Sequence, residues 1–262
     1  MSSALALLLA AAAVDTPPIC TDRPAKANAV CTVPAGMVQL ESSLADWTLA
    51  KLGPTRAELV TAGASLLKLG ISGSSDLQLG LTPYARLTVS EIGRRSRASG
   101  FGDLTVRYKH RLTAASSPLQ VGAIAFVKLP TAAHGLGNRK VEGGLAIPAS
   151  FAAGGPLTLT LGPELDLLAD AEGKGRHLAL ANVVNLSAPV APRLTIAGEL
   201  WTNLNFDPAG TARQASADAA FAYLLSNDLQ LDAGANLGLT RDTPDLELYA
   251  GASVRFGRVR RR

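Results

Sequence analysis

The chain has 262 residues, of which 47% are hydrophobic and 18% are charged, and its formal net charge is +4. This length suits one large all-β domain or two smaller domains. Beyond residue 20, no window approaches the run of about 18 apolar residues that a membrane-spanning helix needs. If this chain spans a membrane, it must cross as a closed barrel of strands, because only helices and closed barrels satisfy every backbone group in lipid.

The N-terminus has the features of a secretory signal peptide. Residues 4–14 are apolar, and the small residues at 11–13 suit a signal peptidase. We therefore expect residues 1–14 to be a signal peptide, with a buried N-terminal helix as the alternative. Export also argues against a nucleic-acid partner.

Cys20 and Cys31 are the only two cysteines in the chain. An exported chain with two cysteines can pair them in the oxidising periplasm. We predict a disulfide that holds residues 15–35, which we expect to be a periplasmic segment before the first strand. A zinc site needs further ligands, and the nearest histidine is His110, so we expect neither a metal nor a cofactor.

From residue 36 onward, apolar and polar residues alternate with a period of two, which is the pattern of half-buried strands. In one such run, Leu229, Leu231 and Ala233 alternate with Gln230 and Asp232. The pattern predicts an all-β, antiparallel, up-and-down transmembrane barrel of about twelve strands over residues 36–256. The expected strands are 37–49, 57–71, 76–89, 102–112, 118–129, 140–152, 156–169, 176–187, 193–205, 212–224, 228–240 and 245–256.

The connections between these strands alternate in character. Small, nearly uncharged turns such as residues 72–75 and 226–228 alternate with more charged connections such as 90–100 and 130–139. Outer-membrane barrels place short turns in the periplasm and longer loops outside, so both chain ends are expected in the periplasm. Residues 257–262 would then form a basic periplasmic tail. A soluble β-sandwich is the structural alternative, although its strands are usually shorter.

Three stretches, residues 19–42, 99–112 and 247–256, resemble the outer-membrane transporter family associated with the meta pathway of phenol degradation. The resemblance implies a barrel in the bacterial outer membrane, surrounded by its lipid. The last stretch is also similar to the C-terminal signal that the outer-membrane assembly machinery reads. The residues that carry this similarity are Tyr249, Gly251, Val254 and Phe256.

Strand parity places charged residues on two opposite walls of the lumen. The basic wall is predicted to hold Arg86, Arg107, Lys109, Arg111, Lys128 and Lys140. The acidic wall is predicted to hold Glu164, Asp166, Glu199, Asp218 and Asp232. Such walls create a transverse field that orients polar solutes in a pore. Alternatively, the charges pair across the lumen and seal the barrel.

Four aromatic residues are also predicted to point into the lumen: Tyr84, Phe126, Trp201 and Tyr249. They either line a path for an aromatic or apolar solute or simply fill space. The histidines at 110, 134 and 177 are scattered and form no catalytic arrangement, so the sequence does not predict an enzyme. The leading hypothesis is an outer-membrane channel or transporter-like barrel for small solutes. The alternative is a structural or interaction barrel with a salt-bridged, sealed lumen.

Overall fold

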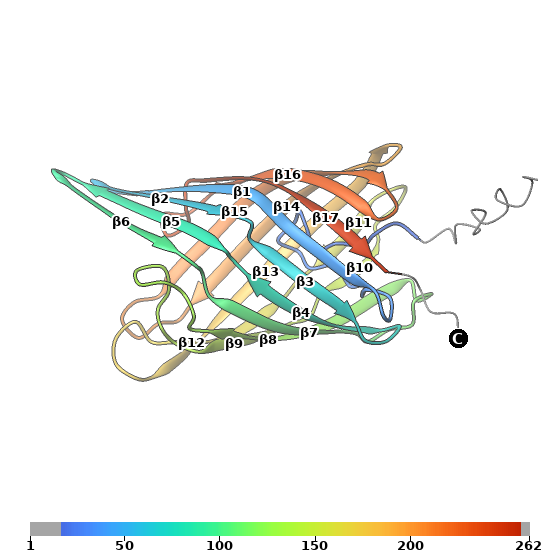
Figure 1. The fold of residues 1–262 in the computed structure, drawn as a ribbon, viewed down its shortest axis with the longest axis horizontal. Helices are drawn as coiled ribbons and strands as arrows, with labels where there is room; N and C mark the ends of the chain where they lie inside the picture. Colours follow the sequence, from blue (N-terminus) through green and yellow to red (C-terminus); the bar gives the residue numbers. More distant parts are fainter. Residues whose placement is uncertain (1–16, 258–262) are drawn as a thin grey trace, which may run out of the picture.

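The computed structural model describes residues 17–257, so the expected signal peptide and most of the basic tail lie outside the described residues. The described chain forms a closed antiparallel barrel of 12 strands, as the alternation predicted (Figure 1). No helix in the described part is long and apolar enough to cross a membrane. The strand segments are β1 (Val38–Leu52), β2 (Thr55–Ala62), β3 (Ser65–Gly70), β4 (Ser75–Leu81), β5 (Tyr84–Glu91), β6 (Arg94–Gly100), β7 (Leu104–Arg111), β8 (Leu119–Leu129), β9 (Glu142–Ala146), β10 (Ala149–Ala152), β11 (Thr158–Leu161), β12 (Glu164–Ala169), β13 (Arg176–Ala191), β14 (Leu194–Asn205), β15 (Ala212–Ser226), β16 (Leu229–Gly238) and β17 (Leu246–Phe256).

Five of the crossing strands consist of two labelled segments: β2 with β3, β4 with β5, β6 with β7, β9 with β10, and β11 with β12. Every interruption contains a proline or a glycine, at Gly63, Pro83, Gly102, Pro148 and Pro163. Proline has no backbone N–H to give to the ladder, and glycine tolerates backbone that other residues avoid. The interruptions therefore follow from local sequence and leave the barrel closed.

The barrel is polar inside and apolar outside. The largest fully buried side chains include Lys68, Lys109, Gln39, Gln78 and Glu41, all of which point into the lumen. The apolar members of the alternation, such as Leu79, Leu165, Leu200 and Leu248, are exposed on the outer surface instead. This inversion is expected when the surrounding solvent is lipid, and it confirms the facing of most strands.

β1 closes the barrel by pairing with β17 along most of its length, from Val38↔Phe256 to Leu49↔Leu246. The register shifts between Ser43 and Ala45, so Leu44 is an extra residue and its side chain is 64% exposed. A β-bulge of this kind changes which residues face inward. Asp46 now shares the inner face with Tyr249, whereas Trp47, which has inward parity by number, faces outward.

A four-stranded sheet extends the barrel at one end. We call it the outer sheet, and it consists of residues 46–52, 55–62, 84–91 and 94–100. Figure 1 shows β2, β5 and β6 reaching beyond the other strands, at the end opposite to the one where β17 finishes. Following the orientation expected from the short turns, we call the end where β17 finishes the periplasmic end and the opposite end, from which this sheet projects, the outer end. Residues 90–100, which we expected to be an irregular outer loop, instead form a hairpin that turns at residues 92–93.

The interruption at Pro83 corrects the predicted facing of Tyr84 and Arg86. Both were expected to point inward, since their even numbers continue the row that begins at Gln78. In the structure it is Ala85 that pairs with Thr61, and the Thr61 hydroxyl donates to Asp46 on the inner face. Ala85 is 5% exposed and Tyr84 is 42% exposed. Tyr84 and Arg86 therefore lie on the outer surface.

Candidate functional site

The lumen contains the chain's own N-terminal segment, residues 17–36, which we call the lumenal segment. The Ile19 N–H donates to the Asn227 carbonyl at 2.7 Å near the periplasmic end, and the Gly36 N–H donates to the Gly70 carbonyl at 2.9 Å. We expected residues 15–35 to lie in the periplasm, and this is wrong from residue 17 onward. The segment enters the barrel because its charges complement those of the walls.

The predicted disulfide between Cys20 and Cys31 is present and closes a loop within the lumenal segment. The Cys20 carbonyl accepts from the Gln39 amide at 2.8 Å, so β1 also holds this loop. Apolar residues of the segment, including Ile19, Ala27, Val30 and Val33, are buried inside the barrel. The disulfide thus braces a compact plug rather than a periplasmic arm.

On the basic side of the lumen, Asp22 gathers three cations. Its carboxylate lies 2.6 Å from Lys109 Nζ, 2.7 Å from Lys68 Nζ and 3.8 Å from Arg107 Nη2. Lys68 also pairs with Glu41, whose carboxylate accepts the Asp22 and Arg23 N–H groups. Sequence reasoning missed Lys68, although its alternation within a leucine-rich strand gives it inward parity.

On the acidic side, the lumenal segment presents cations. Arg23 lies 2.8 Å from Asp232, and Lys26 Nζ lies 2.8 Å from Asp218. Glu199 accepts the backbone N–H groups of Lys26 and Ala27 at 2.8 and 2.9 Å. All three wall carboxylates therefore contact the segment, although Asp218 Oδ1 has no hydrogen-bond partner and Glu199 also accepts from Asn185.

The predicted walls do face each other, but their charges do not pair directly. In the described chain, Arg107 and Lys109 reach Asp22, while Asp232 pairs with Arg23 and Asp218 pairs with Lys26. Glu164 and Asp166, also predicted for the acidic wall, have no ion-pair partner among the described residues. The lumenal segment thus lies between the walls with a negative side toward the basic wall and positive side chains toward the acidic wall. The sealing hypothesis assumed ion pairs directly between the two walls, and this part of it is wrong. The lumen is wide enough to hold the lumenal segment, and the wall charges pair with that segment instead.

The other predicted basic residues occupy three different settings. Lys128 pairs with the neighbouring Asp103 at 3.1 Å and Glu142 at 2.9 Å. Arg111 donates to the Gly73 carbonyl at the periplasmic mouth. Lys140 is exposed in the outer loop before β9 and is not part of a lumen wall, because β9 begins two residues later than expected.

The predicted lumen aromatics also divide. Trp201 lies against Lys26, with 5.0 Å between Nζ and the ring centre, and the Arg23 guanidinium lies 5.9 Å from the centre of the Tyr249 ring. These two rings support the cations of the lumenal segment through cation–π contacts. Phe126 lines open space inside the barrel, and Tyr84 lies outside.

Cavities remain on both sides of the lumenal segment. A cavity of about 420 Å³ in the outer half is lined by Asp22, Lys26, Asn28, Thr105 and Arg107, among others. A smaller one of about 170 Å³ continues from Asn28, Thr105 and Arg107 to Phe126 and Glu164. In the periplasmic half, a cavity of about 280 Å³ again includes Asp22, Arg23, Ala25 and Asn28 in its lining. The segment therefore separates the cavities but is a wall of each.

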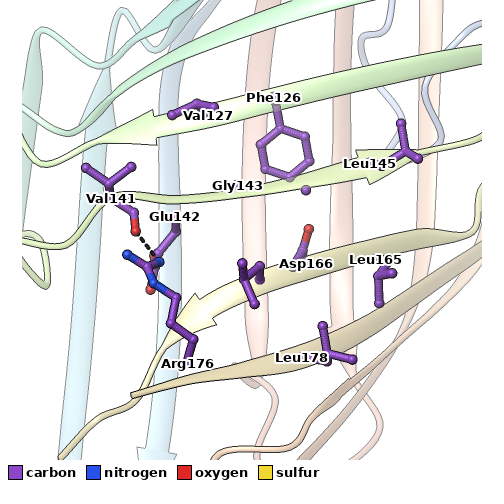
Figure 2. A pocket seen from close by; sticks show the side chains of 12 residues that line it. Phe126, Val127, Val141, Glu142, Gly143, Leu145, Leu165, Asp166, Arg176 and Leu178 are labelled. Atoms are coloured by element: carbon purple, nitrogen blue, oxygen red, sulfur yellow. Dashed lines mark hydrogen bonds between the residues drawn. The ribbon is translucent and has the colours of Figure 1, made fainter. Parts of the chain in front are cut away.

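The barrel wall has no side chains at two consecutive positions of β9, Gly143 and Gly144. A Cβ added to Gly144 would lie 2.7 Å from Phe126 Cζ and would also overlap the carboxylate of Asp166. Figure 2 shows the Phe126 ring and the Asp166 side chain approaching this part of β9 from the two neighbouring strands. A cavity of about 500 Å³ lies here, and its lining includes the outward-facing side chains Val127, Leu145, Leu165, Leu167 and Leu178.

Hydrogen bonds order the outer mouth of the barrel. Asp207 accepts the N–H groups of Ala171 and Ala209, each at 2.8 Å, and these bonds hold the pKa of its carboxyl below the ordinary value. His177 Nδ1 lies 2.8 Å from the Asp170 carboxylate. Within residues 17–257, no cluster of three or more His, Cys, Asp or Glu side chains is placed to hold a metal ion.

A family model described as "Putative MetA-pathway of phenol degradation" matches residues 21–256, a range that includes most of the lumenal segment and every strand. The chain belongs to this family. The resemblance drawn from residues 19–42, 99–112 and 247–256 is thereby confirmed. Among curated proteins, none matches.

Several solved structures share the barrel fold of this family member. An outer membrane channel from Pseudomonas putida F1 is 14% identical, with 89% of this chain and 100% of that chain covered and a TM-score of 0.68. The translocator domain of autotransporter NalP from Neisseria meningitidis is 12% identical, with coverages of 86% and 90% and a TM-score of 0.55. The NanC porin is 8% identical, with coverages of 83% and 98% and a TM-score of 0.54. The chain has the fold of bacterial outer-membrane β-barrels, and these neighbours are named as a channel, a porin and a translocator domain.

In this family member, the final strand combines outer and inner contacts. Phe256 is 53% exposed at the periplasmic end of the outer surface, while Tyr249 and Gly251 face the lumen. A Cβ on Gly251 would overlap the Arg23 guanidinium and the Ser42 carbonyl. Gly251 thus has a packing role that its place in the resemblance to an assembly signal does not reveal.

Proposed function

We propose that the protein is an outer-membrane channel for small solutes, which pass between the outer mouth and the periplasm along the cavities beside the lumenal segment. The observation that carries this proposal is the shared lining of the outer and periplasmic cavities. Asp22, Arg23, Ala25 and Asn28 contribute to both. On this proposal, solutes pass when these residues move aside and the two spaces join.

The lining favours compact solutes that combine an apolar body with a polar group. Leu66, Leu81 and Phe126 provide apolar surface, while Arg107 and Glu164 provide polar contacts within the connected outer cavities. The family description refers to phenol degradation, and a compact aromatic compound with a polar group suits such a lining. The narrow spaces around the segment argue against large polar solutes.

A sealed structural barrel is the second candidate. The ion pairs of Asp22 with Lys68 and Lys109, and of Arg23 with Asp232, favour it, because they fix the segment across the lumen. Under this alternative, the protein conducts no ions and passes no solutes, and the cavities only hold water.

Planar-bilayer conductance and liposome swelling of the native protein distinguish the candidates. Ala25→Trp fills the space shared by the two cavities and should lower both conductance and swelling. Ala219→Trp adds the same side chain on the outer surface of β15 and is the matched control. A native protein that neither conducts nor passes any small solute would reject the channel and leave the sealed barrel.

A further inference from the structure

The two faces of the outer sheet differ sharply in charge. The sheet contains six Lys and Arg residues, and strand pairing places five of them on its outward face. The inward face is formed mainly by small and apolar side chains, including Ala57, Leu59, Leu87, Val89 and Ala98. On that face, the only Lys or Arg is Arg94, at the tip.

The register aligns the outward residues in three rows across the sheet. The row nearest the tip is Lys51, Arg56, Ser90 and Arg95. The next row is Leu49, Glu58, Thr88 and Arg97. The row nearest the barrel is Trp47, Val60, Arg86 and Ser99. Five cations therefore share one continuous surface with a single carboxylate, that of Glu58.

Most of this positive charge has no partner within the described chain. Glu58 accepts from Arg56 at 2.9 Å and so neutralises one cation. Arg95 also interacts with the Glu58 carboxylate through its charge, whereas the side chains of Lys51, Arg86 and Arg97 have no hydrogen-bond or ion-pair partner among the described residues. Solvated surfaces usually mix both signs of charge, so a one-signed face indicates an anionic partner.

The position of the patch relative to the membrane identifies that partner. Trp47 and Tyr84 lie on the same face at the base of the sheet, and tryptophan and tyrosine mark the membrane–water interface. Arg86 is two residues beyond Tyr84, which is about 7 Å along an extended strand. The cations therefore begin where the hydrocarbon ends and continue outward through the level of the lipid headgroups.

We propose that the outward face of the outer sheet binds the phosphate groups of the glycolipid that forms the outer leaflet of the bacterial outer membrane. Arg86, Arg95 and Arg97 are the principal contacts, because a guanidinium pairs with phosphate through two parallel hydrogen bonds. Lys51 adds a point charge near the tip. The bound lipid would hold the protruding sheet against the membrane surface.

Native mass spectrometry of the full barrel, titrated with phosphorylated lipid A in detergent, tests this assignment. Each cation near an anionic lipid surface contributes about fivefold in affinity, so R86Q/R95Q/R97Q should bind lipid A at least about tenfold more weakly than the native protein. R94Q removes a cation from the opposite face and should bind like the native protein. Added salt should weaken native binding, since these charges are exposed.

A second lipid keeps the test decisive if the triple variant does not fold. Lipid A without its phosphates should bind the native barrel no better than a neutral lipid. Equal binding of the two forms of lipid A would overturn the proposal and assign the contact to the acyl chains. Equal weakening by R94Q and by the triple variant would also overturn it, because the effect would then reflect net charge and not this face.

Discussion

Asp22 Oδ1 lies 2.6 Å from Lys109 Nζ, although 87 residues separate them in the chain. Asp22 comes from the lumenal segment, and Lys109 comes from the basic wall. Lys109 is 1% exposed and also donates to the Ala29 carbonyl at 2.8 Å. This contact joins the lumenal segment to the wall, so both the stability and the permeability of the barrel should depend on it.

Asp22→Asn should loosen the lumenal segment. The change leaves Lys68 and Lys109 close together without their shared carboxylate, and breaking a buried ion pair in this way costs about 3–5 kcal/mol. The melting temperature should fall, and the conductance in planar bilayers should rise. Arg111→Ala is the control, because Arg111 contacts only backbone carbonyls at the periplasmic mouth. An unchanged melting curve for Asp22→Asn would mean that this contact does not hold the plug.

Arg107→Ala with Lys109→Ala removes cations from the other side of the same contact. Asp22 then keeps Lys68 alone, so stability should fall and any ion selectivity should move toward cations. Thermal melting and reversal potentials under a salt gradient measure these two effects. If neither changes, the two side chains do not act on the lumen as the structure places them.

The strands were predictable because each one carries its own period-two pattern, which needs no knowledge of its neighbours. Facing failed at the bulge around Leu44 and at Pro83, where a local break changes the parity, and at Lys140, which precedes the start of β9. A proline within a long strand was the available warning. The position of the lumenal segment was not predictable in the same way, because the ion-pair partners of Asp22, Arg23 and Lys26 are wall residues far along the chain. Two cysteines ahead of the first strand were the one local sign of a compact structure there.

Gly251→Ala should disturb Arg23. The added Cβ overlaps the guanidinium that pairs with Asp232, and overpacking of this kind costs about 1–3 kcal/mol. Gly198→Ala is the matched control on β14, since the nearest atom to its added Cβ is 4.0 Å away. Melting of the assembled, purified barrel should detect the loss.

We also propose that Tyr249, Gly251, Val254 and Phe256 are read by the assembly machinery. A Gly251→Ala variant with normal melting but low yield in membranes would favour that role over packing.

Ala235→Arg tests the lipid-facing surface. Ala235 lies on β16 opposite Ala219 and Leu248, in the middle of the outward-facing row. A charge near the bilayer midplane costs a transmembrane barrel about 2–4 kcal/mol. Urea titration of folding into lipid vesicles measures this loss, and Ala235→Leu should show none of it. Undiminished stability of the arginine variant would place this residue away from lipid.

Removing the disulfide should release the lumenal segment without affecting the barrel strands. The bond between Cys20 and Cys31 closes a loop of 11 residues in sequence separation, and such a bond contributes about 2–4 kcal/mol by restricting the unfolded chain. Protein taken from outer membranes and alkylated without reductant should contain no free thiol by mass spectrometry.

Cys20→Ala with Cys31→Ala should melt at a lower temperature and conduct more than the native protein, because Gln39 and Glu41 then hold a looser segment. Reduction of the native protein should reproduce both effects and should leave the double variant unchanged. Two alkylated cysteines in the untreated protein would show that the bond does not form in the membrane.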